Sequence, residues 1–166
     1  MTARRAYGGG VATATLWETA TGVGHLAWYS RQLCSMFGAW ARDDRTPELA
    51  RMFGTMSNHH AELAAACTAR LPAVTLDDET SWTPEQFIAA RDLADEQLPA
   101  RSAEASGAEA RRRAGGRVLT LARDRAVEQV SLIDEVLDEP TADLLDTLIS
   151  RIDAHLLAVA GEASAT

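Results

Sequence analysis

The sequence predicts an all-α protein in which four long helices form a bundle of two antiparallel pairs. Apolar residues recur every three or four positions along four long stretches, the period of a helix with one buried face. No segment alternates apolar and polar residues as a strand would, and polar or proline-containing breaks separate the stretches. The 166 residues are enough for one domain with a hydrophobic core.

The first pair of helices is expected over about residues 13–41 and 47–70. Between them, Thr46 precedes Pro47, which is the pattern of a helix N-cap followed by proline at the first helical position. Pro72 ends the second helix. The inward-facing apolar residues are Leu16, Val23, Leu26, Leu33, Phe37 and Trp40, then Leu49, Met52, Phe53, Met56, Leu63 and Cys67.

Residues 72–116 are predicted to form a long connection that contains a short helix. Thr83 and Pro84 repeat the N-cap and proline pattern, so the short helix begins there and runs to about Glu96. Proline, serine and glycine residues interrupt the rest, up to the Gly115-Gly116 pair. A connection of this length can cross a whole bundle, and the sequence leaves open whether it does.

The second pair is expected over about 117–137 and 140–160, with a break at Asp138-Glu-Pro140. The four helices then make a single domain. Its bounds are 13–161, with a flexible leader at 1–12 and a flexible tail at 162–166.

The composition excludes several classes of function. A net charge of −8 argues against a nucleic-acid partner or an anionic membrane surface. All sixteen basic residues are arginine, so neither a pyridoxal-phosphate lysine nor the lysine of a nucleotide-binding P-loop exists. No stretch is long and apolar enough to span a membrane, and no secretion signal is recognisable, which favours the cytoplasm. We interpret Cys34 and Cys67 as buried structural residues.

Helical geometry predicts that all four histidines point inward at about the middle of the bundle. His59 and His60 flank the inward face of the second helix, and His155 lies beside that of the fourth. A stripe on the first helix and one residue of the third add further inward polar groups. We therefore expect one internal pocket with catalytic residues His59, His60, His155 and Tyr29, and with Glu18, His25, Gln129, Met56 and Phe37 contacting a substrate.

Several short motifs resemble the ferritin-like superfamily, in particular uncharacterised actinobacterial members. They are Phe37-Gly-Ala-Trp40, Thr46-Pro-Glu-Leu49, Asn58-His-His-Ala61, Arg70-Leu-Pro72 and Asp138-Glu-Pro-Thr141. In iron-binding members the resemblance would imply two metals held by Glu and Glu-x-x-His ligands. This sequence has no Glu-x-x-His, since Met56, Ser57 and Ile152 occupy the places three residues before His59, His60 and His155. A di-iron carboxylate centre is therefore not expected.

Three functions remain open from the sequence. The favoured one is metal-free acid–base chemistry on a small, largely apolar metabolite, for which family analogy suggests secondary metabolism. The second is an oxidoreductase or hydrolase with a single transition metal bound by His25, His59, His155 and Glu18. The third is a non-enzymatic homodimer or interaction module that uses an outward-facing Trp28. Arg111, Arg112 and Arg113 are expected to be solvated, with binding of a phosphate or carboxylate as the alternative.

Overall fold

The computed structural model describes residues 15–71, 98–133 and 138–161. The helices in these ranges are α1 (Leu16–Asp43), α2 (Pro47–Ala69), α4 (Leu98–Ala103), α5 (Ala108–Val130) and α6 (Glu139–Ala160). No strand occurs in the described ranges, which confirms the all-α class. None of the described helices is long and apolar enough to cross a membrane.

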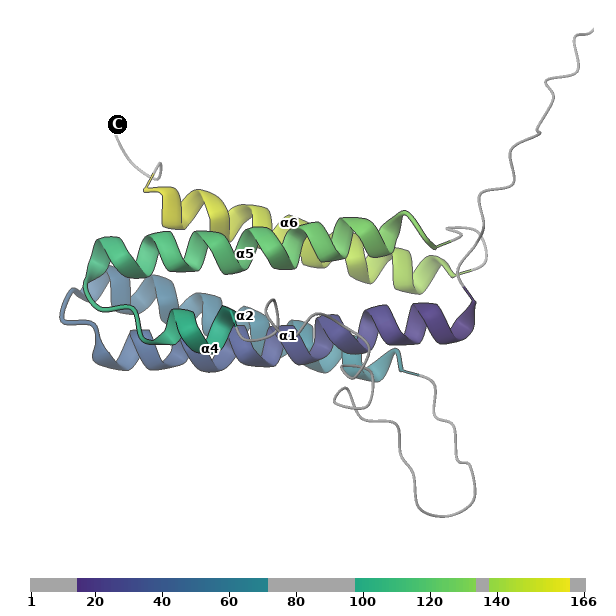
Figure 1. The fold of residues 1–166 in the computed structure, drawn as a ribbon, viewed down its shortest axis with the longest axis horizontal. Coiled ribbons are helices and arrows are strands. Elements are labelled where there is room, and N and C mark those ends of the chain that lie inside the picture. The colour runs from purple at the N-terminus through teal and green to yellow at the C-terminus, as the bar shows by residue number, and fades with distance from the viewer. Residues whose placement is uncertain (1–14, 72–97, 134–137, 162–166) are drawn as a thin grey trace, which may run out of the picture.

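The four long helices lie side by side as two antiparallel pairs, α1 with α2 and α5 with α6 (Figure 1). Arg70 at the end of α2 contacts Asp138 and Thr141 at the start of α6. Arg111 near the start of α5 contacts Asp43 and Asp44 at the opposite end of the bundle. The chain therefore leaves α2 at one end and enters α5 at the other, so the connection spans the length of the bundle.

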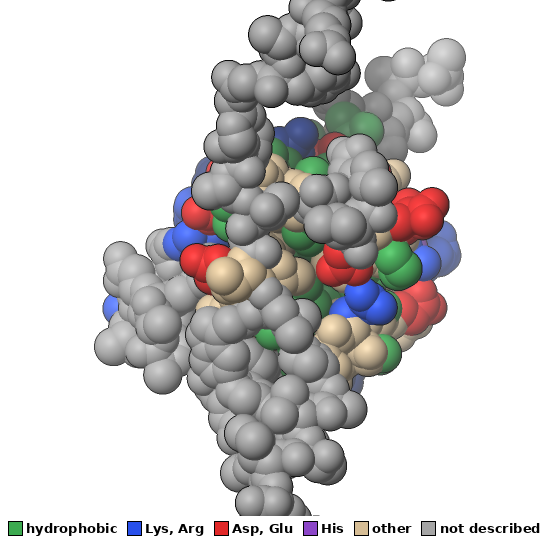
Figure 2. All heavy atoms as spheres, turned by 90° about the vertical axis from the view of Figure 1, so that its right-hand side faces the viewer, with side chains coloured by type: hydrophobic (Ala, Val, Ile, Leu, Met, Phe, Trp, Pro, Cys, Tyr) green, Lys and Arg blue, Asp and Glu red, His purple; other side chains and the backbone are tan. Residues whose placement is uncertain are grey.

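Arg70 links the two helix pairs at the end of the bundle at which α1 begins. Figure 2 looks onto this end and has acidic and basic side chains around its rim. Arg70 donates hydrogen bonds to Asp138 Oδ1 at 2.8 Å and to Thr141 Oγ1 at 2.9 Å. These contacts join the last turn of one helix pair to the first turn of the other, and they set the height of α6 against α2.

The ends of α1 and α2 follow local hydrogen bonding. Thr15 caps α1, because its hydroxyl accepts from the Glu18 N–H while the Glu18 carboxylate accepts from the Thr15 N–H. Thr46 is the N-cap residue of α2 as predicted, with Pro47 next, but its side chain makes no capping bond. Instead, Asp44 Oδ1 accepts from the Thr46 N–H at 2.9 Å and stabilises the turn.

The predicted bounds of the third long helix were wrong. The sequence predicted 117–137, whereas α5 begins at Ala108 and ends at Val130. Gly115 and Gly116 lie inside the helix and do not break it. A Cβ at Gly115 would lie 3.5 Å from the Phe37 ring and 3.6 Å from the Trp40 ring. Packing of α5 against these two aromatic side chains outweighs the weak helix propensity of glycine.

The connection also differs from the prediction where it is described. The short helix expected from Thr83 to about Glu96 lies outside the described residues, as do the leader and the tail. The helix that is described, α4, covers Leu98–Ala103 and was not predicted. Trp40 Nε1 donates to the carbonyl oxygen of Ala103 at 3.2 Å and fixes α4 against α1.

Aromatic rings dominate one part of the core. Phe37 and Phe53 stack with centroids 6.0 Å apart, and Trp40 meets their edges at 5.6 and 5.1 Å. Aliphatic side chains from all four long helices continue the core along the bundle. Among the fully buried ones are Leu33, Leu63, Leu119, Leu145, Leu148 and Ile152.

Arg111 is buried and ion-paired, which contradicts the expectation that the arginine run is solvated. Its side chain is 8% exposed. It donates to Asp44 Oδ2 at 3.0 Å, to Asp43 Oδ2, and to the carbonyl oxygen of Ala105 at 3.2 Å. Arg112 donates to the last carbonyl groups of α6, those of Ala158 and Val159. Arg113 is exposed as predicted.

Substituting Gly22 should reveal how closely α1 and α5 approach. A Cβ there would lie 1.6 Å from Gln129 Oε1, so Gly22→Ala forces the buried Gln129 side chain aside. We expect Gly22→Ala to lower the free energy of unfolding by about 1–3 kcal/mol in urea denaturation. Gly116→Ala is the matched control, because its Cβ meets only Val159 at 4.0 Å. The control should be neutral or stabilising by up to about 1 kcal/mol, and equal losses in both variants would contradict this packing.

Removing the Arg111 guanidinium should destabilise the bundle. Arg111→Met leaves the Asp44 carboxylate, which is 7% exposed, without its charged partner. Breaking a buried ion pair from one side costs about 3–5 kcal/mol, and we expect a loss near the lower figure because the Asp43 side chain is 77% exposed. Thermal and urea unfolding would measure it. Arg113→Met removes an exposed pair with Glu109 on the same helix and should change stability by under about 0.5 kcal/mol.

Candidate functional site

The structure brings three of the four histidines together between α2 and α6. We call His59, His60 and His155 the histidine cluster. His59 Nδ1 and His155 Nε2 are 3.0 Å apart and share a hydrogen bond, and the two rings stack at a centroid distance of 5.2 Å. The His60 and His155 rings are also 5.2 Å apart, tilted by 57°. His60 stacks on Phe37 of α1 on its other side, at 5.8 Å.

Helical spacing explains these positions. His60 continues the buried stripe of α2, four residues after Met56 and three before Leu63. His59 is one residue earlier and so turns about 100° away, which leaves it half-buried beside α6. His155 follows Ile152 by three residues and precedes Val159 by four on the buried stripe of α6. The inward placement predicted for His60 and His155 is confirmed.

The cluster contains polar atoms that are buried without a partner. The His60 side chain has no exposed surface, and neither of its ring nitrogens has a hydrogen-bond partner among the described residues. His155 Nδ1 is also buried without a hydrogen-bond partner among the described residues. Each such group costs about 1–3 kcal/mol of folding free energy relative to a bonded one. This cost marks the cluster as a place where a bound molecule would gain hydrogen bonds that the protein does not supply.

Burial keeps two of the histidines neutral. Desolvation, with the neighbouring His155 and His59, lowers the pKa of His60 to about 3. Desolvation, with His59 and Arg151, lowers the pKa of His155 to about 4. Both imidazoles are uncharged at neutral pH, and each then carries one N–H donor and one lone-pair acceptor.

A salt bridge lies beside the cluster at the surface. Arg151 Nη1 of α6 donates to Glu62 Oε2 of α2 at 2.6 Å. This bond, the charge of Arg151 and a smaller contribution from His59 hold the pKa of the Glu62 carboxyl below its usual value. The sequence analysis missed this pair. The spacing in the sequence could have indicated it, because Glu62 follows His59 by three residues and Arg151 precedes His155 by four, which places each beside a histidine on its helix.

His25, Tyr29 and Gln129 lie elsewhere, which corrects the expectation of a single pocket. Cys34 faces Ser57 and Arg31 faces Thr68 across the α1–α2 interface, so His25 is level with the last turn of α2. His25 therefore lies several turns from His60, which stacks on Phe37. The rings of His25, Trp28 and Tyr29 contact one another with centroids 6.2 Å apart. Gln129 is buried against Gly22 in the same part of the bundle.

Glu18 and Trp28 also differ from their predicted roles. Glu18 is exposed and belongs to the cap of α1, where its bonds to Thr15 hold the pKa of its carboxyl below the usual value. It does not face the interior. Trp28 is half-buried and packs against the core, so it is not a freely exposed partner surface.

Phe37 and Met56 are buried in the core as predicted, and Phe37 contacts the cluster directly. Cys67 is fully buried, which raises the pKa of its thiol to about 12 and agrees with a structural role. Cys34 is half-buried, with its sulfur 3.6 Å from Ser57 Oγ.

The metal ligands expected from sequence are not assembled. His59 and His155 are adjacent, but His25 and Glu18 lie in other places. In the part of the chain that the structure describes, no group of three or more His, Cys, Asp or Glu side chains is arranged to hold a metal ion.

Comparison with known proteins adds no relative to this description. No protein-family model, curated protein or solved structure matches the chain.

The buried histidines should make stability depend on pH in a defined range. Their pKa values are lower in the folded chain than the unfolded value of about 6.5, so their contribution is complete above that pH and is lost as the pH falls. Between about pH 6 and 5 the free energy of unfolding should fall by roughly 1.4 kcal/mol per pH unit for each of the two histidines. Urea unfolding at several pH values measures this slope.

The control for this slope is His60→Phe, which removes one of the two groups and should reduce the slope by about half. Three carboxyl groups have lowered pKa values, those of Glu18, Asp44 and Glu62. They affect the free energy of unfolding at more acidic pH and not between about pH 6 and 5. An unchanged slope in the variant would show that His60 is not buried as a neutral group.

Proposed function

We propose that this chain is a ferritin-like bundle whose histidine cluster binds a small, largely apolar metabolite and exchanges a proton with it without a metal. The ferritin-like assignment is supported by two antiparallel helix pairs with one connection spanning the bundle, the connectivity of such folds. The short motifs that resemble the superfamily agree with this assignment. The absence of any Glu-x-x-His sequence supports a role other than di-iron chemistry.

The observation that carries the proposal is the state of His60. A neutral imidazole with no partner on either nitrogen among the described residues offers one donor and one acceptor inside the core. A ligand hydroxyl or carboxylic acid group can donate to the acceptor nitrogen or, through an oxygen, accept from the donor nitrogen. Gaining these bonds recovers part of the cost of the buried, unpartnered nitrogens, and this gain favours such a ligand over a purely apolar one.

The surroundings of His60 define the rest of the ligand. Phe37 stacks on its ring, and Met56 and Leu63 lie one turn away on either side along α2. Ile152 occupies the turn before His155 on α6. These side chains are apolar and buried, so the body of the ligand should be apolar and small enough to be admitted by local repacking.

His155 and His59 together provide a route for a proton. In the tautomer in which His155 Nε2–H donates to His59 Nδ1, the buried Nδ1 of His155 is an acceptor. A proton taken from the ligand at Nδ1 releases the proton on Nε2 to His59. His59 is half-buried and returns a proton to solvent from its other nitrogen. Glu62, whose carboxylate interacts with His59, favours the transient positive charge on that ring.

Binding of small acids should depend on His60. Octanoate, benzoate and phenol serve as probes in buffer containing EDTA, with the melting temperature and calorimetric titration as measurements. At ten times its dissociation constant a bound probe raises the free energy of unfolding by about 1.4 kcal/mol. His60→Phe should abolish this stabilisation while the variant itself melts no lower than the wild type, because the substitution removes two unpartnered nitrogens.

His25→Phe is the matched control, since it replaces a buried histidine outside the cluster. This variant should keep the response to the probes. Equal responses in wild type and His60→Phe, or no response to any probe, would rule out ligand binding at the cluster.

A further inference from the structure

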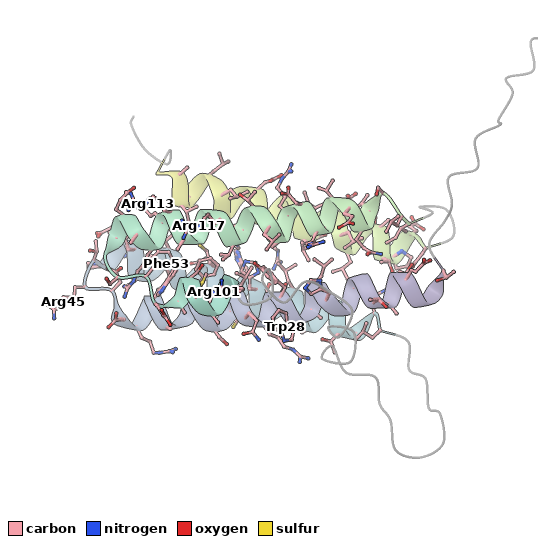
Figure 3. The ribbon with its side chains drawn as sticks, in the orientation of Figure 1. Trp28, Arg45, Phe53, Arg101, Arg113 and Arg117 are labelled. Carbon is pink, nitrogen blue, oxygen red and sulfur yellow. The ribbon has the colours of Figure 1, made fainter. Side chains whose placement is uncertain are left out.

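A second polar site lies between α4 and α5, away from the histidine cluster. A hollow of about 550 Å³ opens there, within the size range of small-molecule sites. Its lining includes Arg101 and Ser102 of α4, Glu104 just beyond α4, and Arg113 and Arg117 of α5. Figure 3 labels the three arginines. We call the space that they line together with Ser102 the arginine hollow.

The arginines that line the hollow come from two elements. Arg113 and Arg117 are four residues apart on α5, so they lie one above the other on the same face. Arg101 comes from α4 on the other side of the hollow. Arg113 pairs with Glu109 at 3.2 Å, an exposed contact that a ligand can displace at little cost. Arg117 is exposed and forms no ion pair within the described ranges.

Ser102 gives an independent sign of a ligand. The residue is only 4% exposed, and its hydroxyl has no hydrogen-bond partner among the described residues. A hydroxyl buried without a partner is costly, and Ser102 is one of the residues that line the arginine hollow. An oxygen atom of an anion bound in the hollow can accept the hydrogen bond that the Ser102 hydroxyl lacks.

The walls of the hollow are held in place by the core. Trp40 donates to the carbonyl oxygen of Ala103, and Arg111 donates to that of Ala105. These bonds fix the chain on both sides of Glu104 against α1 and α5. The hollow is therefore formed before any ligand arrives, which reduces the ordering cost of binding.

From this arrangement we propose that the arginine hollow binds the phosphoryl group of a small soluble phosphate monoester. Three guanidinium groups and one hydroxyl can donate to several oxygens of a phosphoryl group at once, and guanidinium matches phosphate geometry in a bidentate manner. Glu104 also lines the hollow, and Glu109 is the present partner of Arg113. The chain as a whole carries a net charge of −8, so a group of three arginines has the opposite sign to the net charge of the protein.

The test is calorimetric titration of the full chain with methyl phosphate and with inorganic phosphate at low ionic strength. Both probes should bind the wild type, and Arg117→Gln should weaken binding by about tenfold, as for loss of one charge-assisted hydrogen bond. Ser102→Ala should weaken it by a smaller factor. Arg45→Gln is the matched control, because it removes the same charge from the exposed turn between α1 and α2 (Figure 3) and should leave affinity unchanged.

Other results would overturn the proposal. Undetectable binding of both probes in the millimolar range would do so, as would equal affinity in wild type and Arg117→Gln. Equal weakening by Arg45→Gln would indicate diffuse charge attraction, and equally tight binding of acetate would indicate a carboxylate site. Sedimentation with phosphatidylglycerol vesicles separates a lipid headgroup from a soluble ester, because vesicle binding without methyl phosphate binding would assign the hollow to a membrane surface.

Discussion

The ion-paired guanidinium of Arg111 couples the two halves of the bundle. From the first turn of α5, it contacts the end of α1 at Asp43 and Asp44 and the chain that follows α4 at Ala105. With α5 held there, Gly115 passes beside Phe37 and Trp40, and Gln129 reaches Gly22 at the far end of the same interface. The Arg70 contacts with Asp138 and Thr141 then fix the height of α6 from the opposite end. Because the two anchors act at opposite ends, the register of all four long helices is determined.

That register is what creates the histidine cluster. His155 belongs to the second helix pair and His59 and His60 to the first, so their contacts exist only when the pairs dock at one height. A shift of one turn, about 5.4 Å, would separate His155 from both partners. The bundle thus maintains two neutral imidazoles, those of His60 and His155, that the described residues leave partly without hydrogen-bond partners. A fold selected for stability alone would place apolar side chains at these positions, which is the physical reason for assigning a function to the cluster.

The sequence predicted the helical class and the bounds of α1, α2 and α6 to within a few residues, because the apolar period and the Thr46-Pro47 and Pro140 signals are local. It failed at Gly115 and Gly116, whose contacts come from residues far away in the chain. The helical wheel placed His60 and His155 inward correctly. It could not fix the height of His25, which depends on interhelical contacts such as that of Ser57 with Cys34. Ser102 carried no sequence signal, since its environment is assembled by α4 and α5.

The connectivity also has a consequence for how the chain folds. Each helix pair is closed by a short link, so the contacts within α1–α2 and within α5–α6 join residues that are near in sequence. The contacts between pairs, including the Arg111 ion pairs and the His59–His155 hydrogen bond, close loops of 67 to 96 residues. Because closing a long loop costs conformational entropy, we expect such contacts to form late in folding. Each helix pair then folds as a unit, and the histidines meet only when the two pairs dock.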